Sequence, residues 1–261
     1  MTTFKAFLLE RNTRTTAITP QEAIEFLKKN CSKTLQAGKL YRGGPRFPIS
    51  YGDSNLGEPR KSANTPNFYT VFLDNSPAWK DFPKRSRSFV GSTHEQGAYD
   101  VGQWGVQYMI PYDTAHVGIC PAADFWSSFD GLSPDDLNLA IQRYMNQTGM
   151  KWDNQSWPQL EAIMKYEITW DKVHKSEVSR DVKNDLIRLF DWFGVSTALG
   201  IYEHVFKPTN FTHLKAADYR TIHRDLEVWV QGEAVFISIH LDLGEKAPEL
   251  GDFLIDAGYL K

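Results

Sequence analysis

Several common signatures are missing from this 261-residue chain, and each absence removes a class of protein. Two cysteines, Cys31 and Cys120, are too few for a disulfide framework, and neither has a second ligand at zinc spacing. The seven histidines form no His-x-x-x-His pair, so no metal site is predicted. No run of about 18 apolar residues exists, and the N-terminus lacks the basic-then-apolar order of a signal peptide. We therefore expect a protein of a reducing cytoplasm that has no contact with a membrane.

Known nucleotide-binding and hydrolase signatures are absent too. The chain has no Walker-type phosphate loop, no dinucleotide-binding Gly-x-Gly-x-x-Gly and no Gly-x-Ser-x-Gly elbow. Its net charge of -3 argues against nucleic-acid binding driven by overall charge, although a local basic groove stays open. What remains is an ordinary globular composition, with 41% apolar and 23% charged residues, long enough to bury a core.

The first half of the chain, residues 1–130, is predicted to be rich in β-strands. An edge strand is expected within residues 1–18, where Phe4, Phe7 and Leu9 alternate. A helix should follow from the cap Thr19 to Asn30, because proline takes the first helical position and Glu22 stands three residues after the cap.

Further strands are expected at 39–42, 89–90, 107–113 and 116–121. Residues 45–67 are rich in Gly, Pro, Ser and Asn, which predicts a long loop that is either a binding lid or disordered.

The second half changes from helical to β character. Helices are predicted from the cap Ser133 to Gly149, over 156–165, over 179–193 and over 196–206, because apolar residues recur at helical spacing. Gly194 is the expected terminator of the helix over 179–193. Residues 226–232 and 234–243 then alternate around Gln231-Gly232-Glu233, which predicts a β-hairpin.

The sequence thus predicts one α+β domain over residues 1–261. It consists of a β-rich block at 1–130, a helical insertion at 131–210 and a C-terminal hairpin at 211–261 that completes a mixed or antiparallel sheet.

Three short pieces at strand ends carry the candidate chemistry: Tyr41-Arg42-Gly43, Ser92-Thr93 and Glu227. An aromatic-Arg pair, a hydroxyl pair and a strand glutamate resemble the three-part motif of the ADP-ribosyltransferases. The resemblance covers these motifs rather than the whole chain. The chain is also similar to uncharacterised tailed-bacteriophage proteins that carry the block PKRSRSF, here residues 83–89, before a Ser/Thr pair.

The family resemblance implies a fold, a substrate and residue roles. It implies an ADP-ribosyltransferase-like fold, NAD as the donor and a protein or nucleic-acid acceptor. Arg42 would hold the NAD diphosphate, and Gly43 would belong to the cofactor site. Ser92 would orient a ribose or a neighbouring carboxylate, and Thr93 would buttress Ser92. Glu227 would accept a hydrogen bond from the nicotinamide ribose and stabilise the oxocarbenium-like transition state.

Aromatic rings and a second acid complete the candidate set. Tyr99 or Tyr41 could stack on nicotinamide, and Asp124 is the alternative to Glu227 as the catalytic acid. The third hydroxyl of the family motif is missing, because His94 stands there in one register and Gly91 replaces the first hydroxyl in the other.

Each candidate also has a plain structural interpretation. Arg42 is then a surface arginine at a turn, Ser92 and Thr93 cap a helix that begins near Glu95, and Glu227 is a solvent-facing strand residue. The basic residues Arg85 and Arg87 are interpreted as a solvated face.

Two other functions stay open at this point. One is a non-catalytic protein that binds a nucleotide or a partner, such as a phage inhibitor of a host factor, in the host cytoplasm. The other is a glycosyltransferase that modifies nucleic acid with a different nucleotide sugar.

Overall fold

The computed structural model describes residues 14–44, 47–61, 67–101, 105–129, 134–151 and 156–260. The chain divides into two compact units. The first comprises Met1–Ala63, Asp81–Phe125 and Asn210–Lys261, and the second comprises Asn64–Lys80 and Trp126–Thr209. Helices combine with an antiparallel sheet, so the α+β class is confirmed. That the whole chain acts as a single domain stays a prediction.

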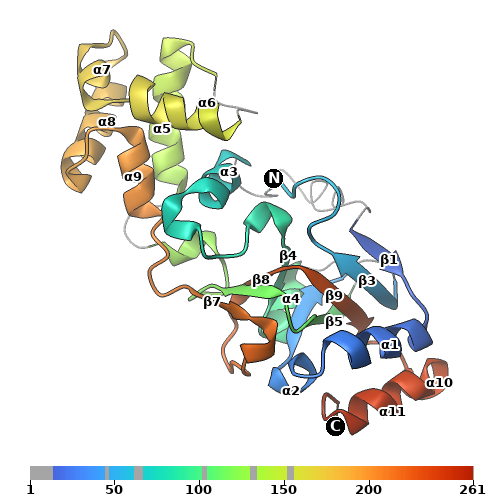
Figure 1. Cartoon of the computed structure of the whole chain (residues 1–261). Coiled ribbons are helices and arrows are strands. Elements are labelled where there is room, and N and C mark those ends of the chain that lie inside the picture. Colours follow the sequence, from blue (N-terminus) through green and yellow to red (C-terminus); the bar gives the residue numbers. More distant parts are fainter. Residues whose placement is uncertain are drawn as a thin grey trace. The chain divides into compact units, whose positions relative to one another are not determined.

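The first unit is built on a sheet whose described part has nine strands, in the order β1-β3-β9-β5-β2-β4-β8-β6-β7 (Figure 1). All the described ladders are antiparallel. The strands are β1 (Thr15–Ala17), β2 (Leu40–Gly43), β3 (Ile49–Asp53), β4 (Phe89–Ser92), β5 (Val106–Pro111), β6 (His116–Ile119), β7 (Thr212–Lys215), β8 (Glu227–Gln231) and β9 (Glu233–Ser238).

Helices α1 and α11 lie side by side at one end of this unit, where Figure 1 draws them in blue and red. The unit's helices are α1 (Pro20–Asn30), α2 (Thr34–Ala37), α4 (Glu95–Val101), α10 (Leu243–Lys246) and α11 (Pro248–Asp256), with 3-10 turns η3 (Arg85–Arg87) and η6 (Ala216–Asp218). The predicted start of α1 is confirmed, because Thr19 and Glu22 form a reciprocal capping box. Helix α11 was not predicted from the sequence.

Among the described residues, two apolar clusters pack against the sheet. One joins α1 and α11 to β3, β5 and β9 through residues such as Leu27, Val235 and Leu254. The other joins the central strands to the segment around η6, with Phe89 and Phe236 among its members. Side chains alternate along each strand, so neighbouring residues of one strand contribute to different clusters.

The predicted C-terminal hairpin is wrong, although both of its strands exist. Strand β8 pairs with β4 and β6, whereas β9 pairs with β3 and β5. Only Gly232 separates the two strands, and one residue is too short for a hairpin loop. Gly232 has a φ of 128°, its amide donates to Ser54 Oγ, and its carbonyl accepts from the Ser54 amide. The chain therefore bends there, and its two strands separate within one sheet.

The predicted long loop at 45–67 is interrupted by a strand. Ile49–Asp53 forms β3, which pairs with both β1 and β9. These are tertiary partners that the local Gly- and Ser-rich composition does not reveal. Residues 45, 46 and 62–66 lie outside the described part, as does the edge strand predicted around Phe4, Phe7 and Leu9.

The second unit is helical over its described residues and confirms the helices predicted there. Its helices are α3 (Asn67–Asn75), α5 (Pro134–Thr148), α6 (Trp157–Ala162), α7 (Trp170–Lys175), α8 (Arg180–Phe193) and α9 (Ala198–Val205), with a π-helical turn at Ile163–Glu167 and 3-10 turns η2 (Pro77–Trp79) and η4 (Trp126–Ser128). Gly194 ends α8 in the left-handed conformation, as its position predicts. Ser133, the predicted cap of α5, lies outside the described residues. Within the part of the chain that the structure describes, no helix combines the length and the apolar character needed to cross a membrane.

Candidate functional site

The three motif strands are neighbours in the sheet, in the order β2-β4-β8. Tyr41 pairs with Ser92, and Ser92 pairs with Glu227, so the three residues occupy one line across the strands. Tyr108 of β5 extends this line, because it pairs with Tyr41. Residues that face each other across antiparallel strands project from the same face of a sheet. A carboxylate, a hydroxyl and two aromatic rings therefore form one row, which we call the Glu227–Tyr108 row.

Arg42 is not part of that row. It follows Tyr41 directly, so its side chain projects from the other face. Its guanidinium carbon lies 5.3 Å from the ring centroid of Phe89, and Nη1 donates to the Val90 carbonyl at 3.1 Å. Strands β2 and β4 share a single rung, and the Arg42 side chain bridges them beside it. The structure thus brings Ser92 and Glu227 together but directs Arg42 away from them.

The hydroxyl pair ties the end of β4 to the segment before β8. Ser92 Oγ donates to Asp225 Oδ1 at 2.6 Å and accepts from the His94 amide at 2.8 Å. Thr93 Oγ1 donates to the Arg224 carbonyl and accepts from the Leu226 amide. Both hydroxyl residues are buried, with 5% exposure each. Their hydrogen bonds fix the register in which Ser92 lies beside Glu227.

The Glu227 carboxylate is held by two donors, one on each oxygen. Arg85 Nη2 lies 2.8 Å from Oε1, and the Phe125 amide donates to Oε2 at 2.9 Å. The side chains of Arg85 and Glu227 are only 5% and 12% exposed. Burial lowers the pKa of the Arg85 guanidinium, and the neighbouring Glu227 opposes that shift. Glu227 is therefore a largely buried, oriented carboxylate rather than a solvent-facing strand residue.

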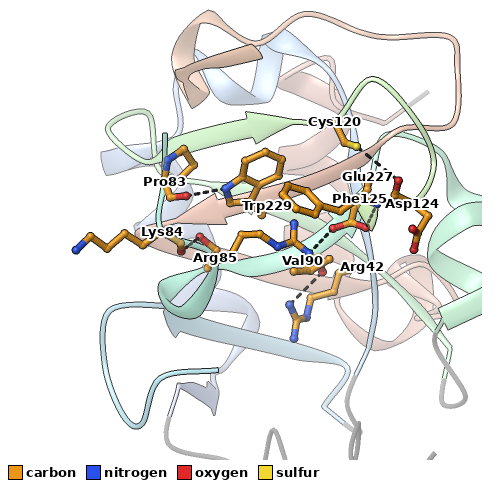
Figure 2. A network of polar contacts seen from close by, with 11 residues as sticks. Arg42, Pro83, Lys84, Arg85, Val90, Cys120, Asp124, Phe125, Glu227 and Trp229 are labelled. Atoms are coloured by element: carbon orange, nitrogen blue, oxygen red, sulfur yellow. Dashed lines mark hydrogen bonds and ion pairs between the residues drawn. The ribbon is translucent and has the colours of Figure 1, made fainter. Parts of the chain in front are cut away.

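Arg85 is packed among aromatic rings, as Figure 2 shows. Its guanidinium carbon lies 3.8 Å from the ring centroid of Phe125 and 5.4 Å from that of Trp229. The interpretation of Arg85 as a solvated basic residue is wrong, because its side chain is buried and paired with Glu227. The sequence does not reveal this burial, because Glu227 lies far away along the chain. No local signal distinguishes it from Arg87, which donates to the carbonyls of Asn55 and Gly57.

The remaining candidates have different surroundings. Gly43 is buried opposite Val106, whereas Tyr99 on α4 is 58% exposed. Asp124 is exposed, and its carbonyl accepts from the Cys120 thiol at 3.7 Å (Figure 2). It precedes Phe125, so the loop that carries it contributes a backbone donor to Glu227. Of the two candidate acids, only Glu227 lies in the row.

The aromatic end of the row is half-buried. The Tyr41 and Tyr108 ring centroids lie 5.7 Å apart, and Lys39 Nζ lies 5.2 Å from the Tyr108 ring. Burial raises the pKa of Tyr41, and the neighbouring Tyr108 and Glu95 raise it further. Burial also raises the pKa of Tyr108. Both rings are therefore neutral at physiological pH, and they suit stacking or a neutral hydrogen bond.

Among the described residues, no group of three or more His, Cys, Asp and Glu side chains could hold a metal ion. No family model, curated protein or solved structure matches the chain. The row and its surroundings are therefore the basis for a functional conclusion.

Proposed function

We propose that the protein is a mono-ADP-ribosyltransferase, which transfers ADP-ribose from NAD to a macromolecular acceptor and releases nicotinamide. One observation carries the proposal: Glu227, Ser92 and Tyr41, which are far apart in the sequence, lie on consecutive strands in a single row. Adjacent strands are about 4.8 Å apart, so the row is about as long as a nicotinamide riboside. The proposal includes the ADP-ribosyltransferase-like fold that the sequence motifs imply.

The chemistry of the row fits the reacting half of NAD. A carboxylate has about four lone-pair sites, and the contacts from Arg85 and Phe125 occupy two of them. Glu227 can therefore still accept a hydrogen bond from a ribose hydroxyl. Its negative charge stabilises the positive charge that develops on the ribose as the bond to nicotinamide breaks. Tyr41 or Tyr108 supplies a ring for the nicotinamide.

The proposed reaction balances without a further cofactor. The bond between ribose C1′ and the nicotinamide nitrogen breaks, and nicotinamide leaves with the electron pair. A nucleophilic atom of the acceptor forms the new bond to C1′ and loses its proton to solvent. Arg42 has no role in this scheme, because its side chain projects from the face of the sheet opposite the row and donates to the Val90 carbonyl.

Release of nicotinamide from NAD by the purified protein tests the proposal. Glu227→Gln should reduce the rate by at least about 100-fold, the cost of removing one electrostatic group from a transition state. Glu203→Gln is the matched control, because it changes an exposed glutamate on α9 and should leave the rate unchanged. Circular dichroism establishes that both variants fold. Intact NAD after long incubation of the wild-type protein with mixed acceptors would refute the proposal.

A second candidate is a protein that binds a nucleotide without turnover. The observation in its favour is that the polar groups of the row already have internal partners. Ser92 donates to Asp225, the Phe125 amide donates to Glu227 Oε2, and Oε1 forms the ion pair with Arg85. In that case NAD raises the melting temperature but is not consumed, and Glu227→Gln still binds it. The same samples, incubated with another nucleotide sugar as donor, test for glycosyl transfer of a different kind.

A further inference from the structure

Arg85 stands out because it is a buried cation that does not belong to the family motif, which singles out Arg42 instead. It lies in the turn η3, and its side chain is 5% exposed. A charged side chain is rarely buried to this degree unless it is paired. Its ion pair with Glu227 therefore connects the turn before β4 to the start of β8.

The two donors on Glu227 act together. Arg85 Nη2 binds Oε1, and the Phe125 amide binds Oε2, so rotation of the carboxylate would break at least one contact. The backbone of the same residue is also fixed, because the Glu227 amide donates to the Ala122 carbonyl and its carbonyl accepts from the Cys120 amide. Only the orientation of the side chain depends on Arg85.

Aromatic packing restricts the guanidinium in turn. Trp229 is fully buried, and its Nε1 donates to the Pro83 carbonyl at 2.7 Å. Figure 2 shows the Arg85 side chain passing beside Trp229 and the Phe125 ring on its way to Glu227. Stacking of a planar guanidinium on such rings is specific to arginine, because lysine has a compact ammonium group instead.

We propose that Arg85 is a positioning residue that holds the Glu227 carboxylate in its orientation for ADP-ribosyl transfer, an inference that rests on the proposed function. Arg85 does not contact NAD in this scheme. It acts by fixing the acid, whereas Phe125 and Trp229 fix Arg85. A misoriented acid lowers the rate of the chemical step and leaves donor binding almost unchanged.

Steady-state kinetics of nicotinamide release by Arg85→Met and Arg85→Lys test this role. We expect Arg85→Met to lower kcat by about 10-fold to 100-fold, as a displacement near 1 Å does, with KM for NAD changed by less than about threefold. Arg85→Lys keeps the charge but loses the planar fork, so it should recover part of kcat. An unchanged kcat, or a rise in KM that explains the whole loss, would overturn the proposal.

A thermal double-mutant cycle tests the same contact without activity. Arg85→Met should lower the melting temperature by several degrees, because it leaves a buried carboxylate unpaired. Adding Glu227→Gln should restore much of the loss, since the two residues are coupled. Arg188→Met with Asp185→Asn is the control cycle, because that pair is 75% and 38% exposed and should show almost no coupling.

The two experiments separate the inference from the function beneath it. If the changes in melting temperature caused by Arg85→Met and Glu227→Gln simply add in the double variant, the positioning role is overturned, whatever the activity. Absence of nicotinamide release by the wild-type protein would overturn the proposed function, and the role of Arg85 in that reaction with it. The cycle would then still decide whether Arg85 holds Glu227.

Discussion

At the scale of single residues, Gly91 allows the pairing of Tyr41 on β2 with Ser92 on β4, on which the Glu227–Tyr108 row depends. A Cβ atom at this position would lie far inside contact distance of the Tyr41 carbonyl oxygen. The backbone of β2 therefore approaches β4 as closely as it does only because position 91 has no side chain. The glycine that interrupts the family's hydroxyl motif in one register thus has a packing role in this fold.

We predict that Gly91→Ala destabilises the protein by about 1–3 kcal/mol, the usual cost of overpacking a buried site. Urea denaturation measures the effect. Gly244→Ala is the matched control, because a Cβ there meets its nearest atom at 3.6 Å and lies in helix α10. Equal stability of the two variants would mean that β2 can move away from β4 at little cost.

At the scale of elements, Asp113 joins the end of β5 to the start of α2. Its carboxylate accepts hydrogen bonds from the Ser32 hydroxyl, the Lys33 amide, and the amide and hydroxyl of Thr34. Burial raises the pKa of Asp113, but the bonds from Thr34, Lys33 and Ser32 outweigh it, so the net pKa is lowered. The four-residue helix α2 begins where this carboxylate supplies acceptors.

A lowered pKa fixes the sign of the pH dependence. Asp113 contributes to the free energy of unfolding at pH values above its unfolded-state pKa of about 3.9. That contribution is lost as the pH falls through the lower pKa of the folded state. We expect Asp113→Ala to cost about 1–2 kcal/mol at pH 7 and less at about pH 3, measured by urea denaturation. Asp252→Ala, at an exposed position of α11, should have a free energy of unfolding within about 0.5 kcal/mol of the wild type at both pH values. A loss that is equal at both pH values would contradict this account.

At the scale of the whole molecule, the sheet of the first unit depends on strands from both ends of the chain. Strands β8 and β9 lie in its interior, β8 between β4 and β6 and β9 between β3 and β5. The N-terminal strands β1 to β6 therefore cannot form a continuous sheet among themselves. Non-local pairing of this kind has to overcome the entropy of closing long loops.

We predict that a chain without residues 227–261 lacks a cooperative unfolding transition in its β-rich unit. A separately added peptide of residues 227–261 should restore the transition, because it supplies the missing interior strands. Near-ultraviolet circular dichroism during urea titration measures both. A single cooperative transition in the truncated chain would show that the first unit closes its sheet in another way.

The sequence by itself determined the elements whose signals are local. The capping box of Thr19 and Glu22 starts α1, Gly194 ends α8, and both segments beside Gly232 are strands. The sequence also identified Ser92 and Glu227 as residues at strand ends whose side chains are candidates for catalysis. These features depend on side-chain hydrogen bonds and periodicities that span only a few residues.

Only the tertiary structure decided which of these residues meet. Register places Tyr41, Ser92 and Glu227 in one row, and strand alternation directs Arg42 to the other face. The tertiary structure also separates β8 from β9 and pairs Glu227 with Arg85, which lies in a distant part of the sequence. Pairing across such separations depends on the packing of the whole sheet, and no short stretch of sequence encodes it.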